Sequence, residues 1–215
     1  MAADQGCLAI ILGGGTRKEW PQVAPYGGAK GRLPTNPYAI AMPGGDRGPV
    51  VLDFATAAGA GGKVYAAHYA GRRIAEGLII DRDGNPTADP QDYYDGGALL
   101  PMAGPKGYGM ALIAELVGGA MLGEAILGLN WLCVFIDLAG FAAPEAYRAA
   151  AEACLNDVRT CPPATGFEAV EVPGERERRL ETENMELGIP LPPATLAVLR
   201  ETGAALGIDT KPLGP

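Results

Sequence analysis

Residues 99–109 read Leu-Leu-Pro-Met-Ala-Gly-Pro-Lys-Gly-Tyr-Gly and precede a long apolar segment. Three glycines and two prolines in so short a span predict a shaped turn, because neither residue readily extends a helix or a strand. Residues 110–127, directly behind it, are apolar except for Glu115 and Glu124. We therefore predict a largely buried helix over 110–127, with its small residues packed closely on a sheet.

Lys106 lies inside the predicted turn, at the start of the predicted helix. A lysine between glycines at a helix start suits a phosphate, because unpaired backbone N–H groups and the helix dipole favour an anion there. The stretch is not a Walker loop, since Gly107 rather than serine or threonine follows the lysine. A solvated lysine in a Gly/Pro turn is the alternative that these residues leave open.

The composition is that of a globular protein, and 215 residues can bury a core as one domain or two small ones. Apolar residues make up 48% and charged residues 20%. A net charge of −8 and the lack of a long basic run argue against nucleic acid as a partner. Two acidic residues within 110–127 argue against a membrane helix there. We expect a cytoplasmic protein that binds neither membrane nor nucleic acid.

The sequence also excludes several kinds of chemistry. The four cysteines show no Cys-x-x-Cys spacing and lie far from the single histidine, His68, so we expect no metal site. The chain has no serine, which removes every serine-nucleophile mechanism. His68 lies in an alanine-rich segment, where a histidine is more typical of packing or of the surface than of catalysis.

Hydrophobic patterning predicts alternating strands and helices. The strands are expected at 7–12, 38–42, 49–54 and 131–138, with a short one at 168–173, and the helices at 55–69, 110–127, 144–160 and 192–206. The mixed charges of 175–186 favour a solvated segment. Asp53 ends the third strand, where its carboxylate could bind a ligand or cap the following helix.

Several short strings, taken in order, resemble the malate/L-lactate dehydrogenase family, the NAD(P)-dependent 2-hydroxy-acid oxidoreductases that lack a Rossmann fold. The strings are Val-Ala-Pro-Tyr-Gly-Gly (23–28), Thr-Asn-Pro (35–37), Val-Leu-Asp-Phe-Ala-Thr (51–56), Gly-Lys-Val (62–64), Asp-Gly-Asn-Pro-Thr (83–87) and Gly-Pro-Lys-Gly-Tyr-Gly (104–109). The resemblance implies an α/β fold of mixed sheet and packed helices. It also implies a cofactor-binding domain over 1–143, a C-terminal helical segment over 144–215 packing back on it, and a homodimer.

The same resemblance implies NAD or NADP as cofactor and a 2-hydroxy or 2-oxo acid as substrate. Lys106 would contact a phosphate or ribose, and Asp53 would be a polar anchor near the nicotinamide. The implied cofactor-binding residues are Asp53, Phe54, Ala55, Gly96, Gly97, Lys106, Gly107, Ala164, Thr165 and Gly166, and the implied substrate-binding residues are Thr35 and Asn36.

The implied reaction moves a hydride between C4 of the nicotinamide and the hydroxyl-bearing carbon, while an imidazole exchanges the hydroxyl proton. Family members carry that imidazole in a Gly-His-x-Gly-Ala string, accompanied by a Ser-His-Gly string, in a part that precedes the strand beginning here at Cys7. Neither string occurs in this chain, and His68 lies outside both, so the catalytic residue is unknown. The alternatives are a catalytically inactive nucleotide-binding protein and a truncated fragment.

The sequence does not separate NAD from NADP. It does not choose among lactate, malate, sulfolactate, ureidoglycolate and cyclic imino-acid substrates either.

Overall fold

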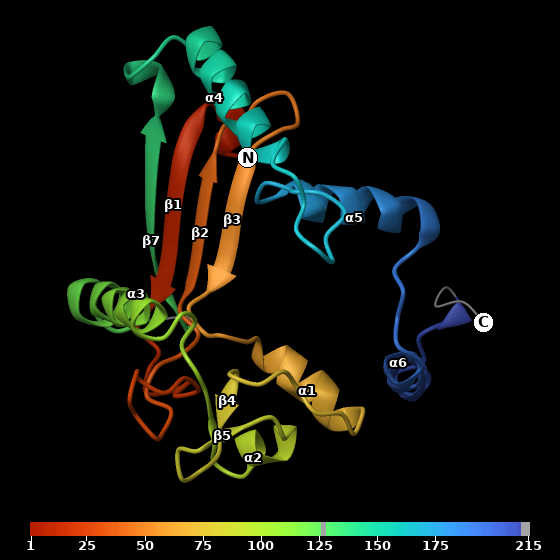
Figure 1. Cartoon of the computed structure of the whole chain (residues 1–215). Coiled ribbons are helices and arrows are strands. Elements are labelled where there is room, and N and C mark those ends of the chain that lie inside the picture. The colour runs from red at the N-terminus through yellow and green to blue at the C-terminus, as the bar shows by residue number, and fades with distance from the viewer. Residues whose placement is uncertain (126–127, 212–215) are drawn as a thin grey trace. The chain divides into compact units, whose positions relative to one another are not determined.

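The structure is a computed structural model that describes residues 1–125 and 128–211. Within these residues, helices are interspersed among the strands along most of the chain, and three α-helices follow the last strand (Figure 1). The strands are β1 (Cys7–Gly14), β2 (Pro37–Met42), β3 (Val50–Ala55), β4 (Ile79–Ile80), β5 (Pro86–Thr87), β6 (Ala98–Leu99) and β7 (Asn130–Asp137). The helices are α1 (Gly61–Tyr69), α2 (Pro90–Tyr94), α3 (Pro105–Glu115), α4 (Pro144–Arg159), α5 (Glu175–Leu187) and α6 (Pro193–Ala205), with short turns η1 (Ala3–Gln5), η2 (Leu116–Met121) and η3 (Leu138–Gly140).

The main sheet has four strands in the order β3-β2-β1-β7, and neighbouring strands are antiparallel. The apolar run at the start of β1, rich in leucine and isoleucine, suits this central strand, whose residues pair on both sides. Each of the four strands predicted at 7–12, 38–42, 49–54 and 131–138 lies within one or two residues of its expected place. An α/β fold of sheets and packed helices is confirmed, although the ladders between named strands in the described residues are antiparallel.

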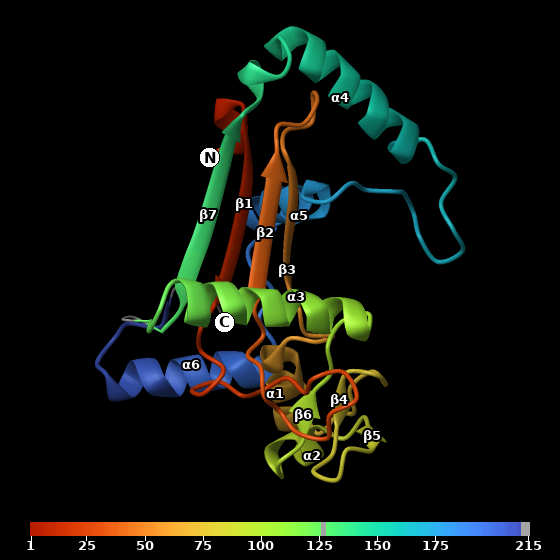
Figure 2. The same ribbon diagram turned by 90° about the vertical axis from the view of Figure 1, so that its left-hand side faces the viewer.

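Helix α3 lies across the end of this sheet at which β1 and β3 finish (Figure 2). It begins at Pro105, so Lys106, Gly107 and Gly109 are helical and the turn predicted over 99–109 is shorter than expected. Proline is tolerated at the first helical position because its missing N–H would have no partner there. From Leu116 the helix widens into the π-type turn η2. The last two residues of the predicted helix, 126 and 127, lie outside the described residues.

The prediction that this helix is largely buried is wrong, and the apolar strand β7 is half-exposed as well. Ile113 and Leu116 on the helix are 54% and 51% exposed, and Trp131 and Phe135 on β7 are 50% and 57% exposed. Cys133, between them, is exposed as well. The apolar pattern is that of buried elements, but the described residues cover these side chains only by about half.

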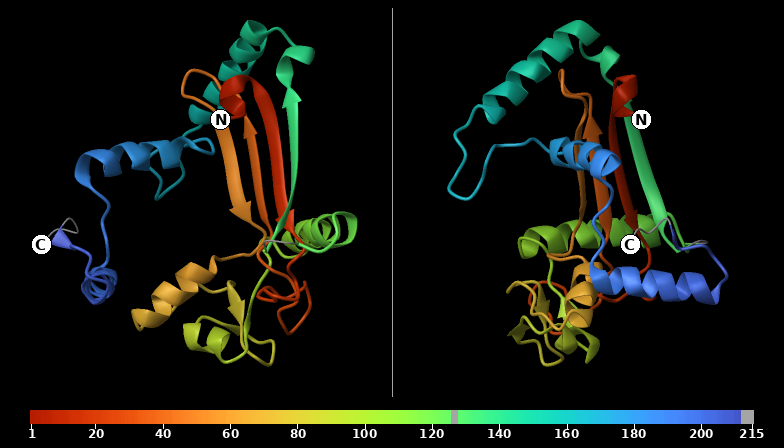
Figure 3. Two further views of the ribbon diagram at one scale, coloured as in Figure 1. Left: turned by 180° about the vertical axis from the view of Figure 1, so that it is seen from behind. Right: turned by 90° about the vertical axis from the view of Figure 1, so that its right-hand side faces the viewer.

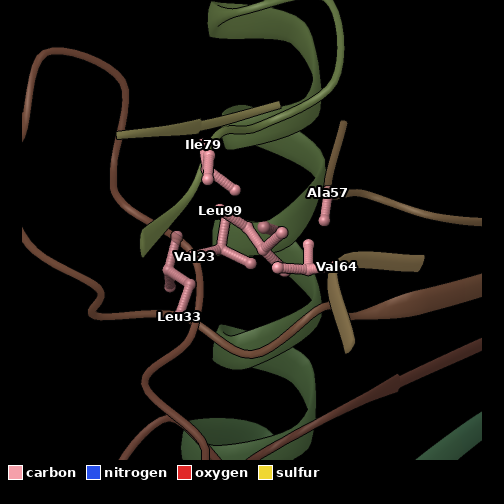
Figure 4. Packing of buried hydrophobic residues seen from close by; sticks show 7 residues of the cluster. Val23, Leu33, Ala57, Val64, Ile79 and Leu99 are labelled. Atoms are coloured by element: carbon pink, nitrogen blue, oxygen red, sulfur yellow. The ribbon is translucent and has the colours of Figure 1, made fainter. Parts of the chain in front are cut away.

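A second, smaller sheet of order β5-β4-β6 lies beside α1 and α2. Its strands hold part of the main hydrophobic core (Figure 4). The core joins side chains from well-separated segments, namely Val23, Leu33, Ala57, Val64, Ile79, Leu99 and Ala111. Because Val23 and Leu33 lie in one core cluster with Ala111 of α3, this core holds the loops around residues 16–36 against α3.

Helix α4 lies at the opposite end of the main sheet from α3 (Figure 3). Tyr147 Oη donates a hydrogen bond of 2.8 Å to the carbonyl oxygen of Pro43, in the β2–β3 connection. The helix matches its predicted range, but its apolar face is not buried, and Val158 is 45% exposed. Residues 168–173 form no strand, although Val51 N–H donates to the carbonyl oxygen of Pro173 at 3.0 Å.

The chain divides into two compact units, Met1–Glu175 and Arg176–Pro215. The first holds both sheets and α1–α4, so the functional boundary expected at 143/144 lies within it and stays a prediction. The second holds α6 and most of α5, in which the charged run predicted to be solvated is helical and has no buried residue. None of the helices described by the structure has the length and apolar character needed to cross a membrane.

Candidate functional site

Three of the strings that carry the family resemblance meet at the start of α3. The backbone N–H and the Oγ1 of Thr56 both donate to the carbonyl oxygen of Thr35, each at 2.9 Å. The carbonyl oxygen of Thr56 in turn accepts from Met102 N–H at 2.9 Å, and the carbonyl oxygen of Met102 accepts from Gly107 N–H at 3.0 Å. Residues 35–37, 51–56 and 104–109 therefore form one continuous site.

Gly107 has to be a glycine at this junction. A Cβ there would overlap the carbonyl oxygen of Met102 and lie 2.8 Å from that of Thr56. The close approach holds the first turn of α3 against the end of β3. Glycine in this string therefore serves backbone packing, and the neighbouring Lys106 stays exposed.

A cavity of about 520 Å³ adjoins Gly104, the residue before α3. Glycines and small residues line much of it, including Gly27, Gly28, Gly77, Gly84, Ala29 and Ala58, together with the ring of Tyr26. Such a wall presents backbone rather than bulky side chains. The cavity has room for a polar ligand of nucleotide size, although Asp83 is a charged side chain in its lining and the N–H groups of Lys106, Gly107 and Tyr108 already donate to backbone carbonyl oxygens.

Asp53, Phe54 and Ala55, the three residues predicted on β3, alternate between the two faces of the sheet, as successive residues of a strand do. Phe54 stacks on Tyr38 with ring centroids 5.7 Å apart, on the face that α3 covers. The Oη of Tyr38 donates to the carbonyl oxygen of Met110 at 2.8 Å, and burial raises the pKa of this tyrosine. Asp53 is exposed on the other face, and Ala55 pairs with Pro37 at the end of the ladder.

Gly96 and Gly97 shape the turn between α2 and β6. Gly96 has a φ of +104°, and a Cβ on Gly97 would overlap the carbonyl oxygen of Ile80. Gly97 N–H donates to the carbonyl oxygen of Asp92 at 2.9 Å. Both glycines are thus required by the local backbone, and they hold the strand that leads to Leu99 and the α3 turn.

The loop of Ala164, Thr165 and Gly166 is exposed and follows α4. Gly166 has a φ of +91°, and Phe167 N–H closes the turn on the carbonyl oxygen of Ala164 at 3.0 Å. Among the described residues, no hydrogen bond or ion pair joins this loop to β3 or α3. The structure thus does not join this loop to the region at the start of α3, and Asp53 also lies outside that region, exposed on the other face of the sheet.

Thr35 and Asn36 differ in accessibility. Thr35 is half-buried and lines a cavity of about 370 Å³, together with Trp20 and Trp131. Asn36 lines the same cavity but has no exposed surface, and it adopts a φ of +37°. Its Nδ2 donates to the carbonyl oxygen of Gly13 at 3.3 Å.

Sequence reasoning missed Glu115, which organises this part of the site although it is only 5% exposed. Its Oε1 accepts from Gly15 N–H and from Asn36 Nδ2, both at 2.8 Å, and its Oε2 accepts from Arg17 N–H at 3.1 Å. The available signal was an acidic residue in an otherwise apolar helix, which commonly marks a buried polar interaction.

His68 lies away from this region, in a group of aromatic rings on α1 and α2. Its ring centroid is 4.8 Å from that of Tyr94 and 5.5 Å from that of Tyr69. These contacts agree with a packing role. Within the described part of the chain, no three histidine, cysteine or acidic side chains gather as a metal site would require.

Comparison with known proteins identifies the family. The model of the malate/L-lactate dehydrogenase family matches residues 1–200. The chain belongs to this family. An L-sulfolactate dehydrogenase from Methanocaldococcus jannaschii is 36% identical over 191 residues, 83% of this chain. An NAD(+)-named ureidoglycolate dehydrogenase from Escherichia coli O157:H7 is 31% identical over 202 residues, 86% of this chain.

Solved structures show the same fold. A sulfolactate dehydrogenase structure from M. jannaschii matches 97% of this chain at 31% identity with a TM-score of 0.78. The family resemblance and the fold expected from the sequence are therefore confirmed. The chain spans 54% and 57% of the lengths of the two relatives above, and 62% of that solved chain.

Proposed function

We propose that this chain carries the nicotinamide-nucleotide site of an oxidoreductase that acts on the CH–OH group of a 2-hydroxy acid. The observation that carries the proposal is the junction of Thr35, Thr56 and Gly107 at the start of α3. There, three family strings meet beside an exposed lysine and a glycine-lined cavity. The relatives named above act on 2-hydroxy acids, and one of them is named for NAD(+).

The residues of this chain suit a dinucleotide. The Lys106 ammonium would hold a phosphate or a ribose hydroxyl, because the N–H groups of Lys106, Gly107 and Tyr108 already donate to backbone carbonyl oxygens, and the small residues around Gly104 leave room for the ligand. Asp53, Phe54 and Ala55 would adjoin the nicotinamide, with Gly96, Gly97 and the 164–166 loop as further contacts. When bound, the nicotinamide supplies or accepts the hydride at C4.

For the 2-hydroxy or 2-oxo acid, we propose the cavity that Thr35 and Asn36 line. Thr35 is accessible there and could contact the acid. Asn36 is buried, so it would act by fixing the wall of the cavity. The choice between NAD and NADP stays open, as does the identity of the acid. A cytoplasmic location also stays a prediction.

We further propose a homodimer. Among the described strands, β7 forms an edge of the main sheet and carries half-exposed Trp131 and Phe135. An uncovered apolar edge strand pairs readily with another chain.

The test is titration of the 215-residue chain with NADH and with NADPH, followed by calorimetry and thermal shift. Saturable binding of either nucleotide is expected, with a rise in melting temperature. Lys106→Ala should weaken binding about tenfold or more, because it removes a charged donor to a phosphate.

Lys63→Ala is the matched control. Lys63 is also exposed in the first turn of a helix, α1, and we assign it no contact with the cofactor. Equal affinity of the Lys106 and Lys63 variants would refute the phosphate role. A wild-type chain that binds neither nucleotide would refute the proposal for this chain.

A further inference from the structure

We propose that Glu115 and Asn36 are positioning residues, which hold α3 and the turn after β1 in the arrangement that binds the cofactor. This inference rests on the function proposed above. Neither side chain needs to touch the ligand, since Asn36 has no exposed surface and Glu115 only 5%. Four observations lead to this role.

First, the backbones of β1 and of the α3–η2 helix are in direct contact. A Cβ on Gly14 would overlap the carbonyl oxygen of Ala114, and one on Gly118 would overlap the backbone of Gly14. With no side chains between them, the Glu115 carboxylate reaches the N–H groups of the turn that follows β1. A larger separation would put these donors out of range.

Second, the carboxylate is held by N–H donors and not by a cation. It accepts hydrogen bonds from Gly15, Arg17 and Asn36, and within the described residues it forms no ion pair. Hydrogen bonds to an ionised carboxylate are stronger than those between neutral groups. Because two of the three donors are backbone groups of one turn, the bonds fix the path of that turn rather than a single side chain.

Third, the dipeptide Thr35–Asn36 is tied to both ends of α3. The Asn36 side chain reaches Glu115 at the C-terminal end. The carbonyl oxygen of Thr35 is linked through Thr56 and Met102 to Gly107 at the N-terminal end, next to Lys106. A loosened bond at Glu115 therefore removes one of the two ties between this dipeptide and the helix that presents Lys106.

Fourth, the fixed turn forms walls of two cavities. Gly15 and Arg17 line one of about 460 Å³ together with Glu115, and Thr16 lines the cavity of about 370 Å³ with Asn36. The Oδ1 of Asn36 is buried and has no hydrogen-bond partner among the described residues. Leaving a buried acceptor unpaired is unfavourable, so the two hydrogen bonds that Asn36 Nδ2 donates must be what fixes this side chain in place.

The test uses Glu115→Gln, which keeps the volume of the side chain. We expect its amide oxygen to take the place of Oε1, because Asn36 Nδ2 donates there, so that its NH₂ group faces Arg17 N–H. Amide hydrogen exchange at Arg17 should become at least about tenfold faster, while β1 stays protected. Affinity for NADH or NADPH should fall about tenfold.

Glu124→Gln is the matched control, since Glu124 lines the same cavity of about 460 Å³ but is exposed. It should change neither exchange at Arg17 nor nucleotide affinity. If the Glu115→Gln chain does not fold, Glu115→Asp gives the same two readouts, because it keeps the charge but withdraws the carboxylate by one methylene.

The outcomes separate the two proposals. A Glu115 variant with faster exchange at Arg17 and wild-type affinity has a structural role only, which overturns the inference while leaving the proposed function standing. Unchanged exchange at Arg17 overturns it as well. A wild-type chain that binds neither nucleotide overturns the proposed function first, and the positioning role with it.

Discussion

At the scale of single residues, Gly118 and Gly109 lie on one helical run but differ in whether a larger residue would fit. A Cβ on Gly118 would overlap the backbone of Gly14, whereas one on Gly109 would meet no atom within 4 Å. Gly118→Ala should lower the free energy of unfolding by about 3 kcal/mol, because backbone on both sides cannot give way. For a chain of this length the melting temperature should fall by roughly 10 °C, as measured by circular dichroism.

Gly109→Ala is the control for that substitution. In a helix interior, replacing glycine by alanine raises the free energy of unfolding by up to about 1 kcal/mol. The melting temperature should therefore stay level or rise by a few degrees. If both variants melt at the wild-type temperature, the close packing of β1 on η2 is wrong.

Individual residues also show how much of the candidate site could be predicted from the sequence. Short strings with glycine, proline and lysine, such as Gly-Pro-Lys-Gly-Tyr-Gly, are local features, and they led to the region around Lys106. The role of Glu115 depends on donors at Gly15, Arg17 and Asn36, about 80 to 100 positions away in the chain. No local pattern holds that information, so the sequence showed an unusual acid but not its partners.

At the scale of elements, α4 is held by an arginine between two acids. Arg159 Nη1 lies 3.1 Å from Glu152 Oε1, and its Nη2 lies 2.8 Å from Glu175 Oε1, with the arginine side chain 7% exposed. Glu175 also accepts from Val172 N–H through Oε2, at 3.0 Å. The ion pair between Arg159 and Glu175 thus anchors the segment that contains Pro173. The carbonyl oxygen of Pro173 accepts a hydrogen bond from Val51 N–H on the edge strand β3.

Arg159→Met should therefore destabilise the chain by about 3 kcal/mol, because it leaves two carboxylates partly buried without their cation. Arg148→Met, on the same helix, is the comparison. Arg148 pairs with Asp46, but both side chains are about two-thirds exposed, so its loss should cost less than about 1 kcal/mol. Urea unfolding of the two variants measures the difference, and equal midpoints would contradict the anchoring role.

Element type was predictable because it depends on local sequence, whereas burial was not predictable because it depends on residues far away in the chain. Strand and helix periods are local, and they located β1, β2, β3, β7 and α4 closely. Burial depends on what covers a face, and the apolar residues of β7 and α3 are exposed within the described chain. The short strand expected at 168–173 is replaced by one backbone hydrogen bond to β3, which no periodicity could reveal.

At the scale of the whole molecule, the uncovered edge of the main sheet is the feature that the fold leaves unexplained. Phe135 on β7 is 57% exposed and shares a face of the sheet with Trp131, which is 50% exposed. If β7 is the homodimer contact proposed above, Phe135→Lys places a charge in it, and the dimer should become at least about tenfold weaker. Sedimentation velocity over a range of concentrations measures the change.

Phe141→Lys controls for the effect of a new charge on an exposed aromatic position. Phe141 is 80% exposed and follows η3, outside the strand. It should sediment as the wild type does, and both variants should keep the wild-type melting temperature at concentrations where the wild type is monomeric. A wild type that stays monomeric at every concentration would refute the homodimer. A dimer that Phe135→Lys leaves intact would place the contact elsewhere, because a lysine at the centre of an apolar strand pairing cannot be accommodated without loss.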